Sequence, residues 1–281
     1  MLAPSLKEIF AIAAKLPAAP RILAEVAELL EDVSVDVDSV ASVLRRDGPL
    51  AAAVLRISNS AYYGSGGVGS IESAVSRIGF AEVHRMIGWA ASGVLAERTL
   101  RYYGIETAML RQNMVCNAVA AERLAASARC NPRHLYTAGL LRPIGMMVLD
   151  RLARSFGDSH DVFDPARDSD YASWESRVMQ IRNAAVTAVV LSEWRFAQDV
   201  VDSVRGHGLT PGAKDPTRGA AVLHLACWVT NEIGLGLPGE HGAWELAPEN
   251  LALAGLVEED VKGLIGPVEE QVRELQTALC Y

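Results

Sequence analysis

Apolar residues recur at intervals of three and four positions along almost the whole chain, and alternation with a period of two over strand length is hard to find. One such apolar stripe is formed by Ile22, Leu23, Val26, Leu29 and Leu30. A spacing of three and four places side chains on one face of a helix, whereas a period of two is typical of a strand. The pattern therefore predicts an all-α protein.

Capping residues and prolines mark the first helix boundaries. Ser5, with Glu8 three residues later, forms a capping-box pattern, and Pro17 follows a first helix that ends near Leu16. Asp36 is placed to cap a third helix, because its carboxylate can accept hydrogen bonds from the first free backbone N–H groups. We thus expect three short helices in this part of the chain.

Two further helices flank a glycine-rich segment. Pro49 suits the first turn of a fourth helix, which runs into Asn59. Residues 64–70 read GSGGVGS and lack the lysine of a P-loop, so we expect an ordinary flexible connection there. A short helix then begins at Ile71 and ends at Gly79.

The rest of the chain predicts longer helices. We expect them at about 81–100, 105–128, 132–154, 172–193, 197–206 and 216–233, with two more at about 247–255 and 258–279. Tyr102-Tyr103-Gly104 marks a joint between halves. The sequence therefore divides into the segments 1–104, 105–235 and 236–281, and the last segment is expected to be a helical tail that packs on the core.

Composition and charge narrow the class of protein. The chain has 281 residues, of which 50% are hydrophobic and 21% charged, and this excludes intrinsic disorder. The net charge of −8 argues against broad binding to phosphate backbones, so no nucleic-acid partner is expected. The first residues lack the pattern of a secretion signal, and no stretch of about 20 uncharged apolar residues follows. We therefore expect a cytoplasmic protein that does not enter a membrane.

The four cysteines do not predict a metal or redox motif. Cys116, Cys130, Cys227 and Cys280 include no C-x-x-C pair and no zinc-finger spacing. We expect them to be reduced and mostly buried.

Three motifs in the first hundred residues carry a family resemblance. They read DGPL at 47–50, LRISNSAYYG at 55–64 and IESAVSRIG at 71–79, and they follow LPAAP at 16–20. In this order they resemble the HDOD domain of bacterial signalling proteins, although Gly48 stands where the family usually has proline. The positions that match the family motifs are Asp47, Pro49, Leu50, Asn59, Ser60, Tyr62, Ser73 and Gly79. For Asn59 and Tyr62 we favour an architectural role over a recognition surface.

The resemblance continues through LLRPIG at 140–145 to about His207 and into the tail, so it covers nearly the whole chain. It implies an all-helical HDOD-type fold, in which an N-terminal helical bundle packs on a half similar to HD-type phosphohydrolases. Those enzymes hold divalent metal ions through histidines and aspartates on neighbouring helices, because a metal-bound water must be made acidic to attack phosphorus.

The same resemblance implies that the metal site is degenerate. Arg142 and Pro143 stand where the enzymes have the His-Asp pair, and neither side chain can bind a metal ion. The other ligand positions correspond to Asn113, Asn183, Gly206, His207 and Cys227. Only His207 and Cys227 carry groups that can coordinate, and two ligands do not make a hydrolytic site. We therefore expect no metal, no cofactor and no catalytic residue.

Arg142 allows two interpretations. It can pair with a carboxylate such as Asp150 or Glu175 and so replace the metal structurally. Alternatively, it reaches into an open cleft with Asn113 and Asn183 and receives a phosphate or carboxylate. We favour the structural interpretation, because a permanent cation on a core-facing helix needs a partner.

The sequence predicts a non-catalytic HDOD regulatory protein that acts in bacterial signal transduction by binding a protein partner on another chain or a small ligand. One alternative is a divergent metal-dependent phosphohydrolase or phosphodiesterase that uses His207. Another is a pseudo-enzyme that senses a nucleotide-like ligand in the cleft of Arg142. The apolar stripe Val261, Leu264, Ile265, Val268 and Val272 is expected to pack in the core rather than to form a docking surface.

Overall fold

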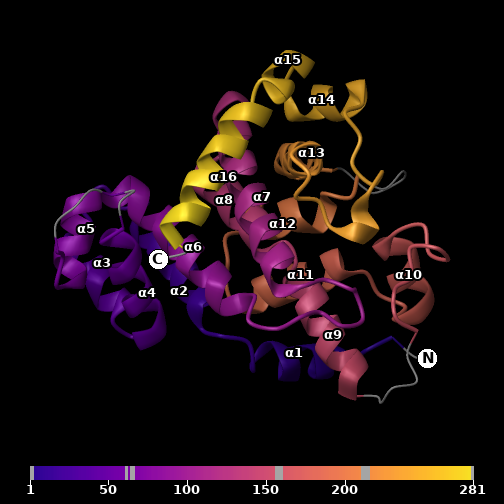
Figure 1. Ribbon diagram of the computed structural model, residues 1–281, viewed down its shortest axis with the longest axis horizontal. Coiled ribbons are helices and arrows are strands. Elements are labelled where there is room, and N and C mark those ends of the chain that lie inside the picture. The colour runs from indigo at the N-terminus through magenta and orange to yellow at the C-terminus, as the bar shows by residue number, and fades with distance from the viewer. Residues whose placement is uncertain (1–2, 61–62, 64–66, 156–160, 210–215, 280–281) are drawn as a thin grey trace. The chain divides into compact units, whose positions relative to one another are not determined.

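The computed structural model describes residues 3–60, 63, 67–155, 161–209 and 216–279 of the chain. All long elements in these residues are α-helices, and no β-strand occurs among them apart from an isolated antiparallel bridge between Leu100 and Ile105. The expected all-α fold is confirmed (Figure 1).

The chain forms two compact units, and each unit is built from two separate segments. The smaller unit comprises residues 17–95 and 269–281, and the larger unit comprises residues 1–16 and 96–268. The division expected from the sequence has three consecutive segments, so it differs from the observed one. The difference arises because the first helix, α1 (Leu6–Ala13), contacts α9 and α11 of the larger unit.

The helices of the smaller unit are α2 (Ala19–Leu29), α3 (Val37–Leu44), α4 (Gly48–Ser58), α5 (Ile71–Ile78) and α6 (Phe80–Leu95). Of these, α3, α4 and α5 begin directly after a capping side chain. The side chain of Asp36 accepts from Ser39 N at 2.7 Å, and that of Ser70 accepts from Ser73 N at 3.1 Å. These bonds satisfy backbone donors that a helix leaves free at its start.

The larger unit contains most of the remaining helices. They are α7 (Thr107–Ser127), α8 (Pro132–Leu141), α9 (Ile144–Ser155), α10 (Tyr171–Val178), α11 (Asn183–Glu193), α12 (Gln198–Gly206), α13 (Arg218–Glu232), the 3-10 turn η2 (Pro238–Glu240), α14 (Pro248–Ala254) and α15 (Glu258–Lys262). The last helix, α16 (Ile265–Leu279), starts in this unit, and its residues from Glu269 onward belong to the smaller one.

The core of the larger unit forms around α7. Its residues 113–121 are all buried, and it packs against α8 and α13. Gly139 permits the close contact with α8, because a Cβ atom there would come within 2.5 Å of the carbonyl oxygen of Asn117. A helix buried on all sides needs such small residues at its crossings.

Three of the expected helices are interrupted. The predicted helix 132–154 ends at Leu141 and resumes at Ile144, because Pro143 has no N–H to donate and disfavours helical backbone at Arg142. The predicted helix 172–193 is broken between α10 and α11, where Gln180 has a φ of 55°. The predicted helix 258–279 is two helices, because Pro267 is tolerated only in the first turn of α16.

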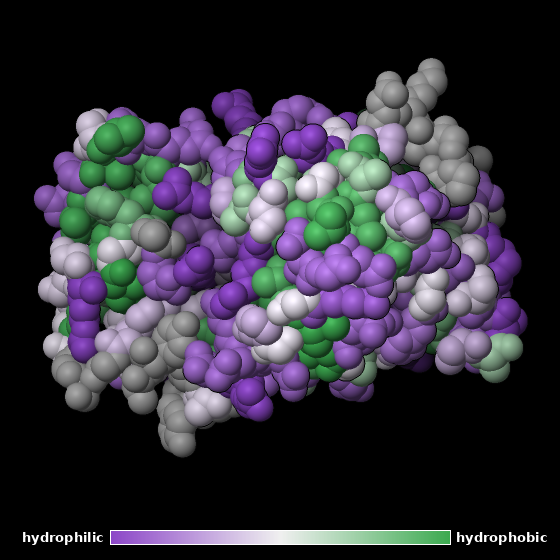
Figure 2. Space-filling model, turned by 90° about the horizontal axis from the view of Figure 1, so that it is seen from above, coloured by the Kyte–Doolittle hydropathy of each residue, from purple (hydrophilic) through white to green (hydrophobic). Residues whose placement is uncertain are grey.

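One face of the molecule is mainly polar. Figure 2 shows hydrophilic residues over most of the face in view, with hydrophobic residues gathered in separate patches. None of the described helices combines the length and the apolar character needed to cross a lipid bilayer.

Candidate functional site

Arg142 lies in the break between α8 and α9, and its side chain is only 1% exposed. Its Nη1 donates to Oε1 of Glu240, and its Nη2 donates to Oε2 of the same carboxylate at 3.0 Å. Nη2 also donates to Oδ1 of Asn113 at 2.8 Å. Burial lowers the pKa of the Arg142 guanidinium, but the charge of Glu240 offsets this effect and the net pKa is raised. The guanidinium is therefore a permanent buried cation held by one carboxylate.

The structural interpretation of Arg142 is supported, but the predicted partners are wrong. Asp150 instead accepts from Tyr102 N and from Arg154 Nε, each at 2.8 Å. Glu175 accepts from the hydroxyl of Tyr103 at 2.7 Å. The real partner, Glu240, comes from η2, which is far along the chain.

Sequence reasoning missed Glu240 because nothing local marks it. The only signal is the preceding glycine: a Cβ atom at Gly239 would lie 2.5 Å from the ring of Tyr171. A glycine at that point lets η2 approach α10 closely enough to bring the Glu240 carboxylate to Arg142. The contact spans 98 positions, so no spacing rule could have predicted it.

Asn113 links Arg142 to the helix α7. Its Oδ1 accepts from Arg142 and also from Asn117 Nδ2 at 3.1 Å, while its own Nδ2 donates to the carbonyl of Leu235 at 2.8 Å. Asn113 is 1% exposed. It therefore positions the guanidinium from behind and does not face solvent.

Asn183 starts α11 and binds Glu175 rather than Arg142. Its backbone N donates to Oε2 of Glu175 at 2.7 Å, and its Nδ2 donates to Oε1 at 2.9 Å. Burial raises the pKa of the Glu175 carboxyl to about 7, although these hydrogen bonds and that from Tyr103 act in the opposite direction. Glu175 thus serves as a buried cap for α11.

The remaining positions of the degenerate site are also buried. His207 stacks on Trp244 with 5.3 Å between ring centroids, and its Nδ1 lies 2.6 Å from the carbonyl of Val204. Nδ1 must carry the proton to make that bond. Burial, together with the charge of Arg142, lowers the pKa of His207 to about 3, and burial raises the pKa of Cys227 to about 12. Both groups are therefore neutral at pH 7.

A cavity of about 400 Å³ lies beside Arg142. Arg142, Asn183, Gly206 and His207 line it, together with Glu240 and Trp244. Asn113, Pro143 and Cys227 do not reach the cavity. The structure thus brings together four of the seven predicted positions and places the other three behind them.

The residues present do not fit the divalent metal that the HD-type resemblance would imply. A guanidinium occupies the centre of the site, and Glu240 is bound to it. Glu175, which also lines the cavity, already accepts from Tyr103 and Asn183. Within the described part of the chain, no group of three or more histidine, cysteine, aspartate or glutamate side chains could hold a metal ion. The side chains at this position form an ion pair and do not provide the ligands of a metal centre.

The motif residues of the smaller unit have local architectural roles. Asn59 Nδ2 donates to the carbonyls of Leu55 and Val68, each at 3.0 Å, and Asn59 Oδ1 accepts from Val68 N at 2.7 Å. The two bonds with Val68 tie the end of α4 to the far end of the glycine-rich connection. This geometry supports the architectural interpretation of Asn59.

The other motif positions begin or end helices. Asp47 caps α4 by accepting from Leu50 N at 2.9 Å, and Gly79 ends α5 with a φ of 80°, which favours glycine. Leu50 is fully buried, Pro49 lies in the first turn of α4, and Ser73 donates its N–H to Ser70. Ser60 lies half-buried after α4, and Tyr62 lies outside the described residues.

Comparison with known proteins agrees with this architecture. The HDOD domain profile matches residues 16–209. No curated protein sequence matches the chain significantly.

Three solved structures show similar folds. A "Putative phosphohydrolase" from Shewanella amazonensis SB2B has 21% identity and a TM-score of 0.64, with 97% of this chain and 98% of that chain covered. An HDOD domain protein with unknown function from Geobacter sulfurreducens has 19% identity and a TM-score of 0.63, with 98% of both chains covered. A "Putative signal transduction protein" from Marinobacter aquaeolei VT8 has 21% identity and a TM-score of 0.70, with 97% of this chain and 64% of that chain covered. With the helical architecture, the ordered motifs and the profile match in agreement, the chain belongs to the HDOD domain family.

Proposed function

We propose that this protein is a non-catalytic HDOD regulatory protein in bacterial signal transduction, which acts by binding a protein partner or a small ligand. The observation that carries the proposal is the buried ion pair between Arg142 and Glu240, which stands where the resemblance puts the metal ligands of HD-type enzymes. Membership of the HDOD family and the similarity to the Marinobacter protein support the signalling context.

The ion pair supplies the charge balance that a metal would otherwise give. A guanidinium cannot accept a proton or bind a metal ion at neutral pH, and it already uses both of its terminal nitrogens. Freeing Glu240 to act as a ligand would leave a buried cation without a partner, which costs several kcal/mol. The energetics thus favour a site that holds its shape over one that opens to do chemistry.

Elemental analysis together with a phosphodiesterase assay tests the proposal against the divergent phosphohydrolase. His207 is the variant of choice, because it is the one predicted ligand position with a free ring nitrogen facing the cavity. We expect less than about a tenth of an equivalent of manganese or iron per chain, and equal background hydrolysis of bis(p-nitrophenyl) phosphate by the wild type and His207→Ala. Stoichiometric metal and turnover that are both lost in His207→Ala, but kept in Cys130→Ser, would overturn the proposal.

A specific observation favours the nucleotide-sensing pseudo-enzyme as a second candidate. Nε of Arg142 and Oδ1 of Asn183 are buried without hydrogen-bond partners, and both residues line the same cavity. Unpaired buried polar atoms cost free energy, so a ligand that supplies an acceptor and a donor there would bind favourably.

Thermal unfolding with a panel of mononucleotides and cyclic dinucleotides tests this candidate. A ligand at one hundred times its Kd stabilises the folded state by about 2.7 kcal/mol and raises Tm by roughly 5–10 °C. The shift should vanish in Ala243→Phe, which fills the cavity from an exposed lining position. If none of the panel shifts Tm, the nucleotide-sensing role is wrong and the regulatory proposal rests on a protein partner.

A further inference from the structure

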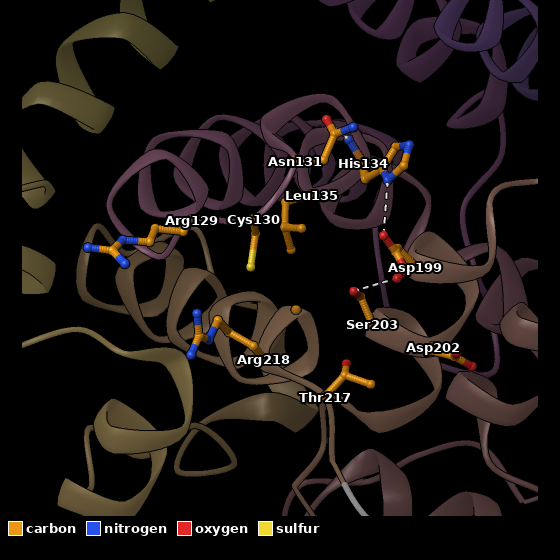
Figure 3. Close-up of a pocket in the computed structure, with 11 residues that line it drawn as sticks. Arg129, Cys130, Asn131, His134, Leu135, Asp199, Asp202, Ser203, Thr217 and Arg218 are labelled. Carbon is orange, nitrogen blue, oxygen red and sulfur yellow. Dashed lines mark hydrogen bonds and ion pairs between the residues drawn. The ribbon is translucent and has the colours of Figure 1, made fainter. Parts of the chain in front are cut away.

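A second cavity lies in the larger unit and shares no lining residue with the cavity beside Arg142. It has a volume of about 420 Å³ and lies between the end of α7, the start of α8, the helix α12 and the start of α13. Cavities of roughly 300–1,000 Å³ accommodate small molecules. Figure 3 shows that its two walls carry side chains of opposite charge.

Arg129 and Arg218 form the cationic wall. Figure 3 shows both side chains to the same side of Cys130, and that of Arg129 extends away from it. Among the described residues, neither guanidinium makes an ion pair or a hydrogen bond. Arg218 is also the first residue of α13, where the helix dipole disfavours a cation. Two uncompensated guanidinium groups in a chain with a net charge of −8 favour a bound carboxylate or phosphate.

The backbone next to both arginines is well defined. Arg129 has a φ of 55°, and the next residue, Cys130, donates its N–H to the carbonyl of Ala125 at 3.0 Å, which closes the end of α7. The guanidinium of Arg218 lies beside Gly255, where a Cβ atom would be 3.8 Å from its Cζ. Both side chains are exposed, so their guanidinium groups are open to a ligand from solvent.

Asp199 and Asp202 form the acidic wall from one face of α12. Asp202 already accepts from Arg205 Nη1 at 2.8 Å and from Gln198 Nε2 at 2.9 Å. Oδ2 of Asp199 lies 3.6 Å from His134 Nδ1, which is longer than a hydrogen bond. Asp199 thus has room to accept from a cationic group in the cavity.

Cys130 lies between the two walls. Figure 3 shows its sulfur pointing toward Arg218. Burial raises the pKa of this thiol, Arg218 lowers it, and Asp199 raises it. Cys130 lines the cavity together with residues of both walls, so a molecule bound in the cavity would shield its thiol.

We propose that this cavity binds a small zwitterion of the size of an amino acid or a dipeptide. The carboxylate or phosphate end pairs with Arg129 and Arg218, and the ammonium end pairs with Asp199. The opposite walls exclude molecules of a single charge sign: the acidic wall repels polyanions, and the cationic wall repels metal ions and polyamines. This site is independent of the regulatory function proposed above, because it uses none of the residues around Arg142.

Protection of the Cys130 thiol tests the proposal directly. The full chain carrying Cys280→Ser is treated with a thiol reagent, and modification at Cys130 is followed by mass spectrometry; Cys116 and Cys227 are buried. The probes are glycylglycine, N-acetylglycine, which lacks the ammonium, and glycinamide, which lacks the carboxylate. With glycylglycine at ten times its Kd, we expect the rate of modification to fall by about ten-fold. The two single-charge probes should protect less than about two-fold at the same concentration.

Matched variants show which charges are responsible. Arg218→Gln and Asp199→Asn should each abolish the protection, because each removes a charge that pairs with one end of the zwitterion. Arg195→Gln is the control, since Arg195 is exposed and lies outside the cavity. Arg195 has a φ of 61°, so its backbone is left-handed like that of Arg129. Protection by N-acetylglycine that survives Asp199→Asn would show a plain anion site and overturn the proposal. Absence of protection by glycylglycine up to about 100 mM would also overturn it.

Discussion

Arg142 shows how a permanent cation is held in the interior of the protein. Its charge remains buried because Glu240 and Asn113 occupy its terminal nitrogens. A buried ion pair is weak evidence for stability, since desolvation of the two charges offsets much of their attraction. Its importance appears when only one partner is removed.

The first prediction concerns Glu240→Ala. This variant should lower the free energy of unfolding by roughly 3–5 kcal/mol, because it leaves the Arg142 guanidinium buried without a counter-charge. Denaturant unfolding of the purified chain measures the change. The double variant Arg142→Met and Glu240→Leu should recover most of the loss, because an apolar pair needs no counter-charge.

An exposed ion pair supplies the control for this prediction. Lys262 and Glu258 form a pair on the surface of α15, with side chains more than half exposed. Lys262→Ala should cost less than about 1 kcal/mol. If Glu240→Ala lowers the free energy of unfolding as little as Lys262→Ala does, the buried pair does not hold the site together.

The second prediction concerns pH and Glu175. Its folded-state pKa of about 7 lies above the ordinary value of 4.5, so the folded protein binds this proton more tightly than the unfolded chain does. The resulting contribution is fully present below about pH 4.5 and is lost as pH rises through 7, and it amounts to about 3 kcal/mol. Unfolding experiments at pH 5 and pH 8 should show this loss in the wild type.

Glu175→Gln isolates the effect, because glutamine keeps an acceptor for Tyr103 and does not titrate in this range. The free-energy difference between wild type and variant should therefore change with pH, in favour of the variant at pH 8. A difference that stays constant between these two pH values would refute the raised pKa.

At the scale of elements, local signals predicted helix starts well. The capping box of Ser5 and Glu8 and the cap at Asp36 are present, because a cap depends only on neighbours within one turn. The break at Pro143 was underestimated, because the apolar period continues on both sides of it. Helix periodicity reports which face is buried, and it does not report whether the backbone is continuous.

The candidate site was predictable only in part, for the same physical reason. The resemblance singled out Arg142 and Asn113, which do touch each other. Glu240 and Trp244 complete the site from a segment that has no helical period and no motif, so tertiary packing alone brings them there. Contacts across such separations depend on the whole fold rather than on spacing.

The third prediction concerns the packing of α9 against α11. A methyl group on Gly145 would overlap the backbone carbonyl of Asn183 and crowd Thr187 Oγ1. Gly145→Ala should therefore destabilise the protein by about 1–3 kcal/mol, because backbone cannot move as easily as a side chain. Gly266→Ala is the matched control: it also lies in the first turn of a helix, but a Cβ atom there meets nothing within 4 Å. Equal Tm values for the two variants would contradict the close packing.

At the scale of the whole molecule, the chain contributes to two cores, because it passes from one compact unit to the other more than once. Val268 is buried in the larger unit, and Val272 and Leu275 are buried in the smaller one. The predicted core role of Val268 and Val272 is thus supported by their burial.

The fourth prediction follows for the C-terminal segment. Removal of residues 262–281 should lower Tm and cause aggregation, because it takes buried apolar side chains away from both cores. Thermal unfolding and size-exclusion chromatography check this outcome. A truncated chain that is equally stable and remains soluble would contradict it.

The assignment of α1 to the larger unit has a consequence for biosynthesis. This helix leaves the ribosome before α9, which it contacts and which begins only at Ile144. At roughly 5–20 residues per second, the ribosome needs about 7–26 s to make the chain between them. During that interval the apolar face of α1, with Ile9 and Ala13, has nothing to cover it. During synthesis, α1 therefore waits for its packing partners, while the segment 17–95 behind it can already begin to collapse.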